Sequence, residues 1–258
     1  MPDLDQSSSY LICATPRTGS TLLCGLLADT GIAGKPESYF RLPDERYYAA
    51  SWSVPVGPDG PHDYRDYTRA AMAAGSTTNG VFAARVMWGT MEEVVAKLRA
   101  AYRHPTGTDL EVLHQVFGRT RFVHLQRGDP LAQAVSWARA EQTEHWQDGE
   151  RTAPERPPRF DFNEVDRYLR TINAHNTAWR EWFGSCAIAP LTVTYEDLVA
   201  DMSGTAAAIL RFLDLELPVD HVVVPRTRRQ ADELNEEWTS RYHARATSAR
   251  ELRKEAVA

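Results

Sequence analysis

A short apolar run, a polar turn and an amphipathic helix open the chain, and this order constrains the fold more than any other feature. The run Tyr10–Ala14 (YLICA) has the continuous apolar character of a buried parallel strand. The polar turn Thr15–Gly19 follows it, and leucines then recur at helical spacing within Ser20–Asp29. A strand that leads through a short turn into a helix is typical of α/β proteins, so the sequence predicts a parallel sheet.

Three further apolar runs continue this alternation: Val81–Trp88, Arg121–Leu125 and Leu191–Thr194. Helical spacing follows each of them, and the helices are expected at Met91–Tyr102, Pro130–His145 and Tyr195–Leu213, with another at Phe162–Trp182. The stretch Asp44–Asn79 predicts turns around one short helix, Asp66–Ala74. We therefore expect an α/β fold with a doubly wound parallel sheet flanked by helices. No Gly/Ser-rich or Pro-rich linker divides the chain, so residues 1–258 are predicted to form a single domain.

The charge balance and the cysteines narrow the class of protein. The formal net charge of −6 leaves no broad basic surface for a nucleic acid, so any anion must be held by a local cluster. The three cysteines form no C-x-x-C pair and no zinc spacing, so we expect no metal. No export signal and no membrane-length apolar stretch is seen, which predicts a cytoplasmic protein without integral membrane association.

The first turn carries the sharpest chemical signal, the sequence TPRTGST between a strand and a helix. Backbone N–H groups at a helix N-terminus bind anions, and Gly19 lets the backbone approach the ligand closely. Ser20 and Thr21 add hydroxyl donors, and Arg17 adds a permanent positive charge. From this window alone, an ordinary capped turn between strand and helix is an equally good interpretation.

The turn differs from the loop that binds nucleoside triphosphates. That loop needs G-x-x-x-x-G-K-[ST], and here no glycine opens the turn and no lysine follows Gly19. A second candidate anion ligand is Arg127, which follows the third strand, with Ser136 nine residues later on the next helix. From spacing alone, Arg127 is more simply a surface residue beside Asp129.

Taken together, five segments resemble a known family. TPRTGST is similar to the 5′-phosphosulfate loop of sulfotransferases that use 3′-phosphoadenosine-5′-phosphosulfate (PAPS), P-K-[ST]-G-[ST]-[TS], with Arg17 where many members have lysine. The resemblance is closest to the bacterial trehalose 2-sulfotransferase family, in which arginine is usual here. The other similar segments are GKPESYF (34–40), RVMW (85–88), RGDPLAQAVSWARA (127–140) and RQADELNEEWTSRY (229–242).

The resemblance implies a P-loop-like sulfotransferase fold that binds PAPS as sulfuryl donor and releases adenosine-3′,5′-bisphosphate, without a metal. The first turn would hold the 5′-phosphosulfate, and residues after the third and fourth strands and in the tail would hold the 3′-phosphate and the adenine. The donor-binding residues implied in this way are Arg17, Thr18, Gly19, Ser20, Thr21, Arg127, Ser136, Tyr195, Arg229 and Gln230.

The resemblance also implies a reaction in which a small acceptor gives up a hydroxyl proton, for example a carbohydrate such as trehalose or a glycosylated metabolite. The expected catalytic residues are Glu37 as base and Arg17 as the charge that stabilises the leaving group. Related loops read P-Q-E-[FY]-F, whereas here Pro36 is followed by Glu37 and Ser38, so the carboxylate is shifted by one residue. The acceptor-site residues implied are Glu37, Tyr39, Phe40, Arg85 and Trp88.

Several alternatives remain open at this point. Without the resemblance, Glu37 is more simply a solvated carboxylate or a partner of Lys35, and His62, His104 and His145 are other candidate bases. The chain could also be a kinase-like P-loop transferase for small molecules, or a non-catalytic phosphoadenosine-binding protein. The resemblance further implies a homodimer, with the Arg/Glu-rich tail from about residue 225 closing over the donor or over a partner subunit.

Overall fold

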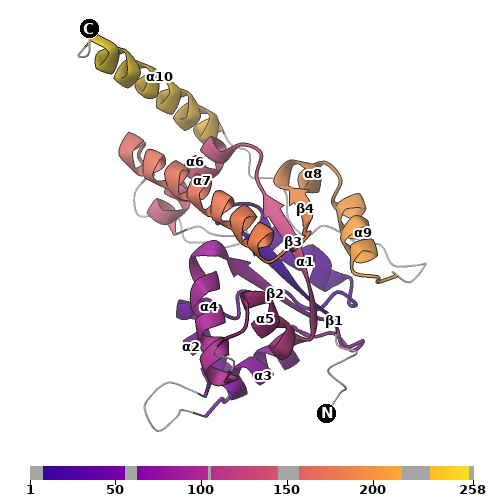
Figure 1. Cartoon of the computed structure of the whole chain (residues 1–258). Helices are drawn as coiled ribbons and strands as arrows, with labels where there is room; N and C mark the ends of the chain where they lie inside the picture. The colour runs from indigo at the N-terminus through magenta and orange to yellow at the C-terminus, as the bar shows by residue number, and fades with distance from the viewer. Residues whose placement is uncertain (1–7, 56–62, 104–105, 145–156, 217–232, 256–258) are drawn as a thin grey trace.

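The structure is a computed structural model that describes residues 8–55, 63–103, 106–144, 157–216 and 233–255 (Figure 1). Strands and helices alternate along much of the chain. Their bounds are β1 (Ser8–Ala14), α1 (Ser20–Asp29), α2 (Leu42–Ser51), α3 (Tyr64–Gly75), β2 (Phe82–Met87), α4 (Trp88–Ala101), α5 (Asp109–Phe117), β3 (Arg119–Gln126), α6 (Pro130–Thr143), α7 (Phe162–Ser185), β4 (Leu191–Thr194), α8 (Tyr195–Ala200), α9 (Met202–Phe212) and α10 (Glu233–Glu255).

The four strands form one parallel sheet in the order β2-β1-β3-β4. The strand β1 is central, and its register places Cys13 beside both Val86 of β2 and His124 of β3. All but the first of its residues are buried, which explains the uninterrupted apolar run. Because the strands are parallel, the segments that follow all four strands lie at the same edge of the sheet.

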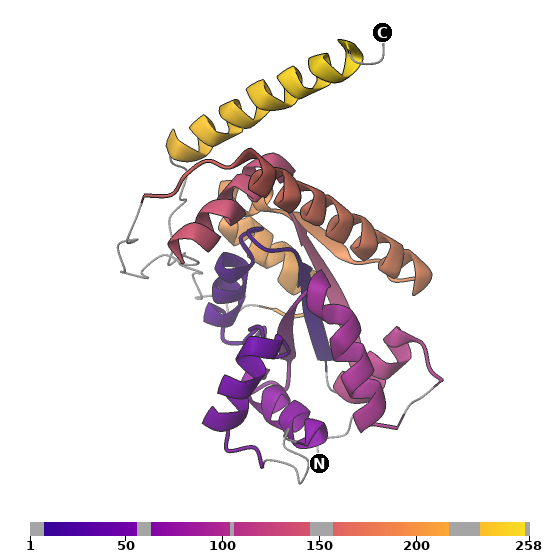
Figure 2. The same cartoon turned by 90° about the vertical axis from the view of Figure 1, so that its left-hand side faces the viewer.

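Both faces of the sheet are covered, which confirms the predicted α/β class. Leu11 and Cys13 of β1 pack into a cluster with residues of α2, α3, α4, α5 and the end of α7. Tyr10 and Ile12 point to the opposite face, where they pack with residues of α1, α8 and α9. Figure 2, turned by 90°, shows helices on both sides of the strands.

A third apolar cluster joins α6, α7 and α10. Trp238 and Tyr242 of α10 are 1% and 8% exposed and pack against residues such as Val135 of α6 and Val165 of α7. The C-terminal end of α10 points away from the body of the molecule (Figures 1 and 2). This part of the Arg/Glu-rich tail therefore packs on α6 and α7 of its own chain.

Two helices that the sequence analysis did not predict lie on the β2 side of the fold, and one predicted helix is divided. The segments of α2 and α5 were expected as turns or left unassigned, and the short helix predicted at Asp66–Ala74 is longer, as α3. The single helix predicted at Tyr195–Leu213 is divided into α8 and α9. Asp201 is the N-cap of α9, because its side chain accepts a hydrogen bond from the Gly204 N–H.

The buried His124 gives the fold a dependence on pH. His124 is 2% exposed and packs beside Trp179 and Phe183, with ring centroids 6.4 and 5.1 Å away. Burial, helped by the charge of Arg180, lowers the pKa of His124 to about 4. The folded protein therefore binds fewer protons than the unfolded chain between this value and about 6.5, so stability falls as pH drops through that range.

We expect His124→Phe to remove much of this dependence. The wild type should lose about 3 kcal/mol of unfolding free energy from this group between pH 7 and pH 4, and the variant should not. Urea unfolding at several pH values measures the difference, with the exposed His114→Gln as control. An equally steep pH profile in His124→Phe would show that other groups cause the acid sensitivity.

Candidate active site

The turn between β1 and α1 has a backbone that only glycine accommodates well at its last position. Gly19 is the N-cap of α1 with φ 79°, and no side chain caps the helix. A Cβ atom on Gly19 would lie 2.6 Å from Cδ2 of Tyr195, at the start of α8. The turn therefore offers uncapped N–H groups to an anion while an aromatic ring covers the glycine.

Buried hydrogen bonds hold this turn from beneath. The Gln133 amide of α6 donates to Oγ1 of Thr15 at 2.8 Å and to the carbonyl of Pro16 at 2.6 Å. The Thr18 hydroxyl donates to the carbonyl of Thr15 at 2.9 Å, so its side chain points inward. Gln133, which is fully buried, was missed in the sequence analysis. Its position one helical turn before Ser136 is the signal that could have found it.

On one side of the turn, four predicted donor-binding residues lie together. The Nε of Arg17 donates to Oγ of Ser136 at 3.1 Å, and Nη1 of Arg127 lies 3.5 Å from the carbonyl of Arg17. The Arg127 guanidinium lies 4.8 Å from the ring centroid of Tyr195. These contacts join the segments after β1, β3 and β4, and they place two arginines at the turn between β1 and α1.

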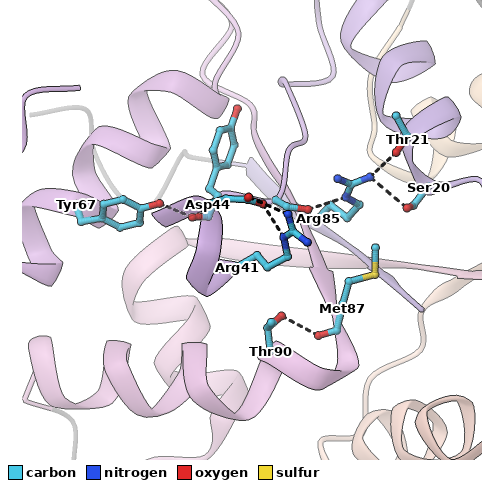
Figure 3. A network of polar contacts seen from close by, with 10 residues as sticks. Ser20, Thr21, Arg41, Asp44, Tyr67, Arg85, Met87 and Thr90 are labelled. Atoms are coloured by element: carbon cyan, nitrogen blue, oxygen red, sulfur yellow. Dashed lines mark hydrogen bonds and ion pairs between the residues drawn. The ribbon is translucent and has the colours of Figure 1, made fainter. Parts of the chain in front are cut away.

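On the other side, Arg85 of β2 joins three hydroxyl groups (Figure 3). Its Nε donates to Oγ of Ser38 at 2.9 Å, and its Nη1 donates to Oγ of Ser20 at 3.2 Å and to Oγ1 of Thr21 at 2.9 Å. The alternation along β2 directs Arg85 to the face that carries α1, because its neighbours Ala84 and Val86 belong to the opposite cluster. Arg85 thus links the start of α1 to the segment before α2.

The expected base Glu37 lies in this same segment, and its backbone contacts that of Arg85. The carbonyl of Glu37 accepts a hydrogen bond from the backbone N–H of Arg85 at 2.9 Å. Its side chain is exposed, whereas Ser38 is 7% exposed and turns inward to the guanidinium. Burial raises the pKa of Tyr48 in α2 and that of Cys24 in α1, and the charge of Glu37 raises both further, so the carboxylate lies near the starts of both helices.

Two of the expected acceptor-site residues belong to the core instead. Tyr39 is 4% exposed and its hydroxyl donates to the carbonyl of Lys35 at 2.7 Å, while Phe40 is 3% exposed and packs on Phe117. Their burial leaves little surface for an acceptor, which corrects the expectation for both side chains. Trp88 is half-buried, with its ring 4.9 Å from that of Trp179.

Some of the sequence predictions concern residues outside the part that the structure describes. These are Arg229 and Gln230, expected at the 3′-phosphate, and the alternative bases His62, His104 and His145. Among the described residues, no group of three or more His, Cys, Asp or Glu side chains could hold a metal ion. Within the same ranges, no helix is long and apolar enough to cross a membrane.

Fold and site together define a class: an α/β protein whose β1–α1 turn, flanked by arginines, is built like the anion-binding loop of P-loop-like proteins. Residues 9–245 match the Stf0 sulphotransferase family, and the chain belongs to it. The chain is therefore a sulfotransferase, a transferase enzyme.

Several known proteins are similar to this chain. The chain is 28% identical over 260 residues to a trehalose 2-sulfotransferase of Mycobacterium tuberculosis. The matched region covers 92% of this chain and 95% of that protein. It is also 28% identical, with the same coverage, to a trehalose 2-sulfotransferase of Mycolicibacterium smegmatis. Among solved structures, the sulfotransferase domain from the curacin biosynthetic pathway is 16% identical, with a TM-score of 0.48, over 89% of this chain and 82% of that one.

The close approach of Gly19 to the Tyr195 ring can be tested separately from its positive φ angle. Gly19→Ala should displace Tyr195, since the Cβ and the ring cannot share the space, and at the donor site that the resemblance implies it should weaken binding of adenosine-3′,5′-bisphosphate at least about tenfold. Gly31→Ala is the control, because Gly31 has φ 70° with nothing within 4 Å. Both variants cost about 1 kcal/mol of backbone strain, which thermal unfolding measures. Equal affinities by calorimetry would contradict the role of the ring contact.

Proposed function

We propose that this sulfotransferase moves a sulfuryl group from PAPS to a hydroxyl of a small acceptor. The donor assignment rests on one observation: four side chains contact one another beside the uncapped start of α1. They belong to Arg17, Arg127, Ser136 and Tyr195. Two arginines and an N-terminal helix end suit a ligand with two separate anionic groups. A carbohydrate acceptor is proposed because both curated relatives are named trehalose 2-sulfotransferases.

The strand order supports one orientation of the donor. Arg127 and Tyr195 follow β3 and β4, whereas Arg85 belongs to β2, on the other side of the central β1. The 3′-phosphate and the adenine would lie over the ends of β3 and β4. There Arg127 would bind the phosphate and the ring of Tyr195 would contact the adenine. The phosphosulfate would then extend across the start of α1, with its sulfuryl end toward β2.

The proposed chemistry is an in-line displacement at sulfur. The acceptor oxygen forms a bond to sulfur while the bond between sulfur and the bridging oxygen of the 5′-phosphate breaks, and the electron pair leaves with adenosine-3′,5′-bisphosphate. Charge grows on that bridging oxygen, and Arg17 together with the N–H groups of α1 would stabilise it. The scheme uses no metal.

Glu37 is the proposed base that takes the proton of the acceptor hydroxyl. The carboxylate is exposed to solvent, in the segment that Arg85 holds through the Glu37 carbonyl and the Ser38 hydroxyl. Ser38, which accepts a hydrogen bond from the Arg85 guanidinium, has no charge with which to take a proton. A positioned base typically contributes about 10²–10⁴-fold in rate.

The two other candidate functions make different demands on the site. A kinase-like transferase would need a Walker lysine and magnesium, and the turn has neither the lysine nor the opening glycine. A non-catalytic phosphoadenosine-binding protein would keep the donor site and lose the base, whereas here the exposed carboxylate of Glu37 is present beside Ser38. The predicted homodimer and cytoplasmic location remain predictions.

A thermal-shift series followed by a turnover assay tests the proposal. Adenosine-3′,5′-bisphosphate should raise the melting temperature more than ADP, or ATP with magnesium, because only the bisphosphate presents anions to both ends of the site. Turnover of ³⁵S-labelled PAPS is then measured with trehalose, maltose, glucose and a glycosylated alcohol. A larger shift with ATP and magnesium would favour the kinase-like alternative, and binding without turnover of any acceptor would favour the non-catalytic one.

Two substitutions test the base. Glu37→Gln should lower turnover at least about 100-fold while affinity for adenosine-3′,5′-bisphosphate stays unchanged. Ser38→Ala should have a smaller effect, since it removes a neutral hydrogen-bond partner of Arg85. Glu92→Gln, an exposed carboxylate on α4, is the matched control. A Glu37→Gln enzyme with wild-type turnover would remove Glu37 from the mechanism.

A further inference from the structure

We propose that His175 of α7 forms one wall of the acceptor site and donates a hydrogen bond from Nε2 to an oxygen of the bound acceptor. The inference rests on the proposed function, because it concerns the second substrate of the same reaction. Neither the sequence motifs nor the residues that resemble the family include this histidine. His175 lies near the end of β1, faces Gly89 of α4 and has a neutral ring.

The place of His175 follows from the anchor one helical turn further along α7. The indole N–H of Trp179 donates to the carbonyl of Ala14, the last residue of β1, at 3.0 Å. His175 precedes Trp179 by four residues, so it lies on the same face of α7, about 6 Å away along the helix axis. His175 therefore lies near the edge of the sheet where the strands end, close to the turn that begins at Thr15.

Across from His175 lies the start of α4. Cε1 of His175 is 3.6 Å from the position that a Cβ atom on Gly89 would occupy. The helix α4 follows β2 without a loop, and its N-cap Met87 provides no side-chain cap. Gly89 is exposed, so this place is open to solvent. Figure 3 shows Met87 and Thr90, at the start of α4, in the same view as Arg85.

The order of the strands puts this place on the acceptor side. β2 and the start of α4 lie on one side of β1, and the segments that would hold the nucleotide follow β3 and β4 on the other side. The acceptor must approach the sulfuryl end of the donor, which the proposed orientation directs toward β2. His175 and Gly89 flank that approach, and Arg85, four residues before Gly89, reaches the start of α1.

The state of the ring indicates a donor rather than a base. Nδ1 of His175 is buried and has no hydrogen-bond partner among the described residues. Burial lowers the pKa of His175, so the ring is neutral at pH 7. A buried N–H without a partner is rarer in proteins than an unused acceptor, which favours the tautomer with the proton on Nε2. The half-buried ring then has one N–H to offer to a ligand.

Three substitutions at this position distinguish the two ring nitrogens. His175→Gln can place an N–H donor near the position of Nε2, whereas His175→Asn reaches only as far as Nδ1 and His175→Phe keeps the ring without a donor. The Asn and Phe variants should raise KM for the sugar about tenfold while KM for PAPS changes less than about twofold, and Gln should recover most of the loss. The probe is trehalose, or whichever sugar of the panel the wild type sulfonates fastest. His114→Gln, on the exposed side of α5, is the control.

A substitution on the facing helix tests the same site without touching the histidine. Gly89→Ala places a methyl group between α4 and the ring at ordinary contact distance, and alanine is a better helix former than glycine. The melting temperature should therefore stay the same or rise, while KM for the sugar increases. Gly184→Ala in α7, with nothing within 4 Å of its Cβ position, is the matched control and should leave KM unchanged.

The outcomes separate this inference from the proposed function. An active wild type whose His175→Asn and His175→Phe variants keep the wild-type KM for the sugar would overturn the role of His175 and leave the proposed function intact. Equal increases in KM for PAPS and for the sugar would also overturn it, because they indicate a general structural defect. A wild type that transfers no label from PAPS to any sugar would overturn both.

Discussion

The charged hydrogen bonds of Arg85 connect the two halves of the candidate site, and the geometry of the acceptor side depends on them. One guanidinium joins Ser38, which precedes α2, to Ser20 and Thr21, which begin α1. Bonds from a charged donor are stronger than neutral ones and fix direction through the planar fork. The backbone N–H of Arg85 also holds the carbonyl of Glu37. The same residue therefore positions both the segment that carries the proposed base and the helix end that would meet the donor.

The turn between β1 and α1 is held by side chains from helices outside the strand–helix unit. Gln133 of α6 bonds to Thr15 and Pro16, and Trp179 of α7 bonds to Ala14. All three hydrogen bonds end on backbone or hydroxyl oxygens in the interior, where an unsatisfied group would be costly. A turn preorganised in this way loses little further freedom when an anion binds. The same contacts place α7, with His175, over the edge of the sheet.

The elements predicted from sequence are those whose burial pattern is local. The four strands and the helices α1, α4, α6 and α7 were all expected, because their apolar runs or 3.6-residue spacing reflect packing on one neighbour. The helix α5 was missed although Thr108 and Glu111 form a capping box, a signal that the sequence does contain. The helix α2 has almost no apolar periodicity, and it packs mainly through aromatic contacts such as that of Tyr48 with Tyr39. Only the tertiary structure could show it.

For the site, a role in anion binding could be predicted from the sequence for the glycine-containing turn, for Arg17 and for Arg127. These are recognisable because each follows a strand, and parallel strands bring the segments after them to one edge. The tertiary structure decided which way each side chain points. It buries Tyr39 and Phe40, exposes Glu37 and turns Ser38 toward Arg85. It also brings Gln133 and His175 to the edge of the sheet from helices more than 100 residues further along the chain than the first turn. The physical reason is that side-chain direction in a loop, and contact between distant helices, follow from packing that no local pattern encodes.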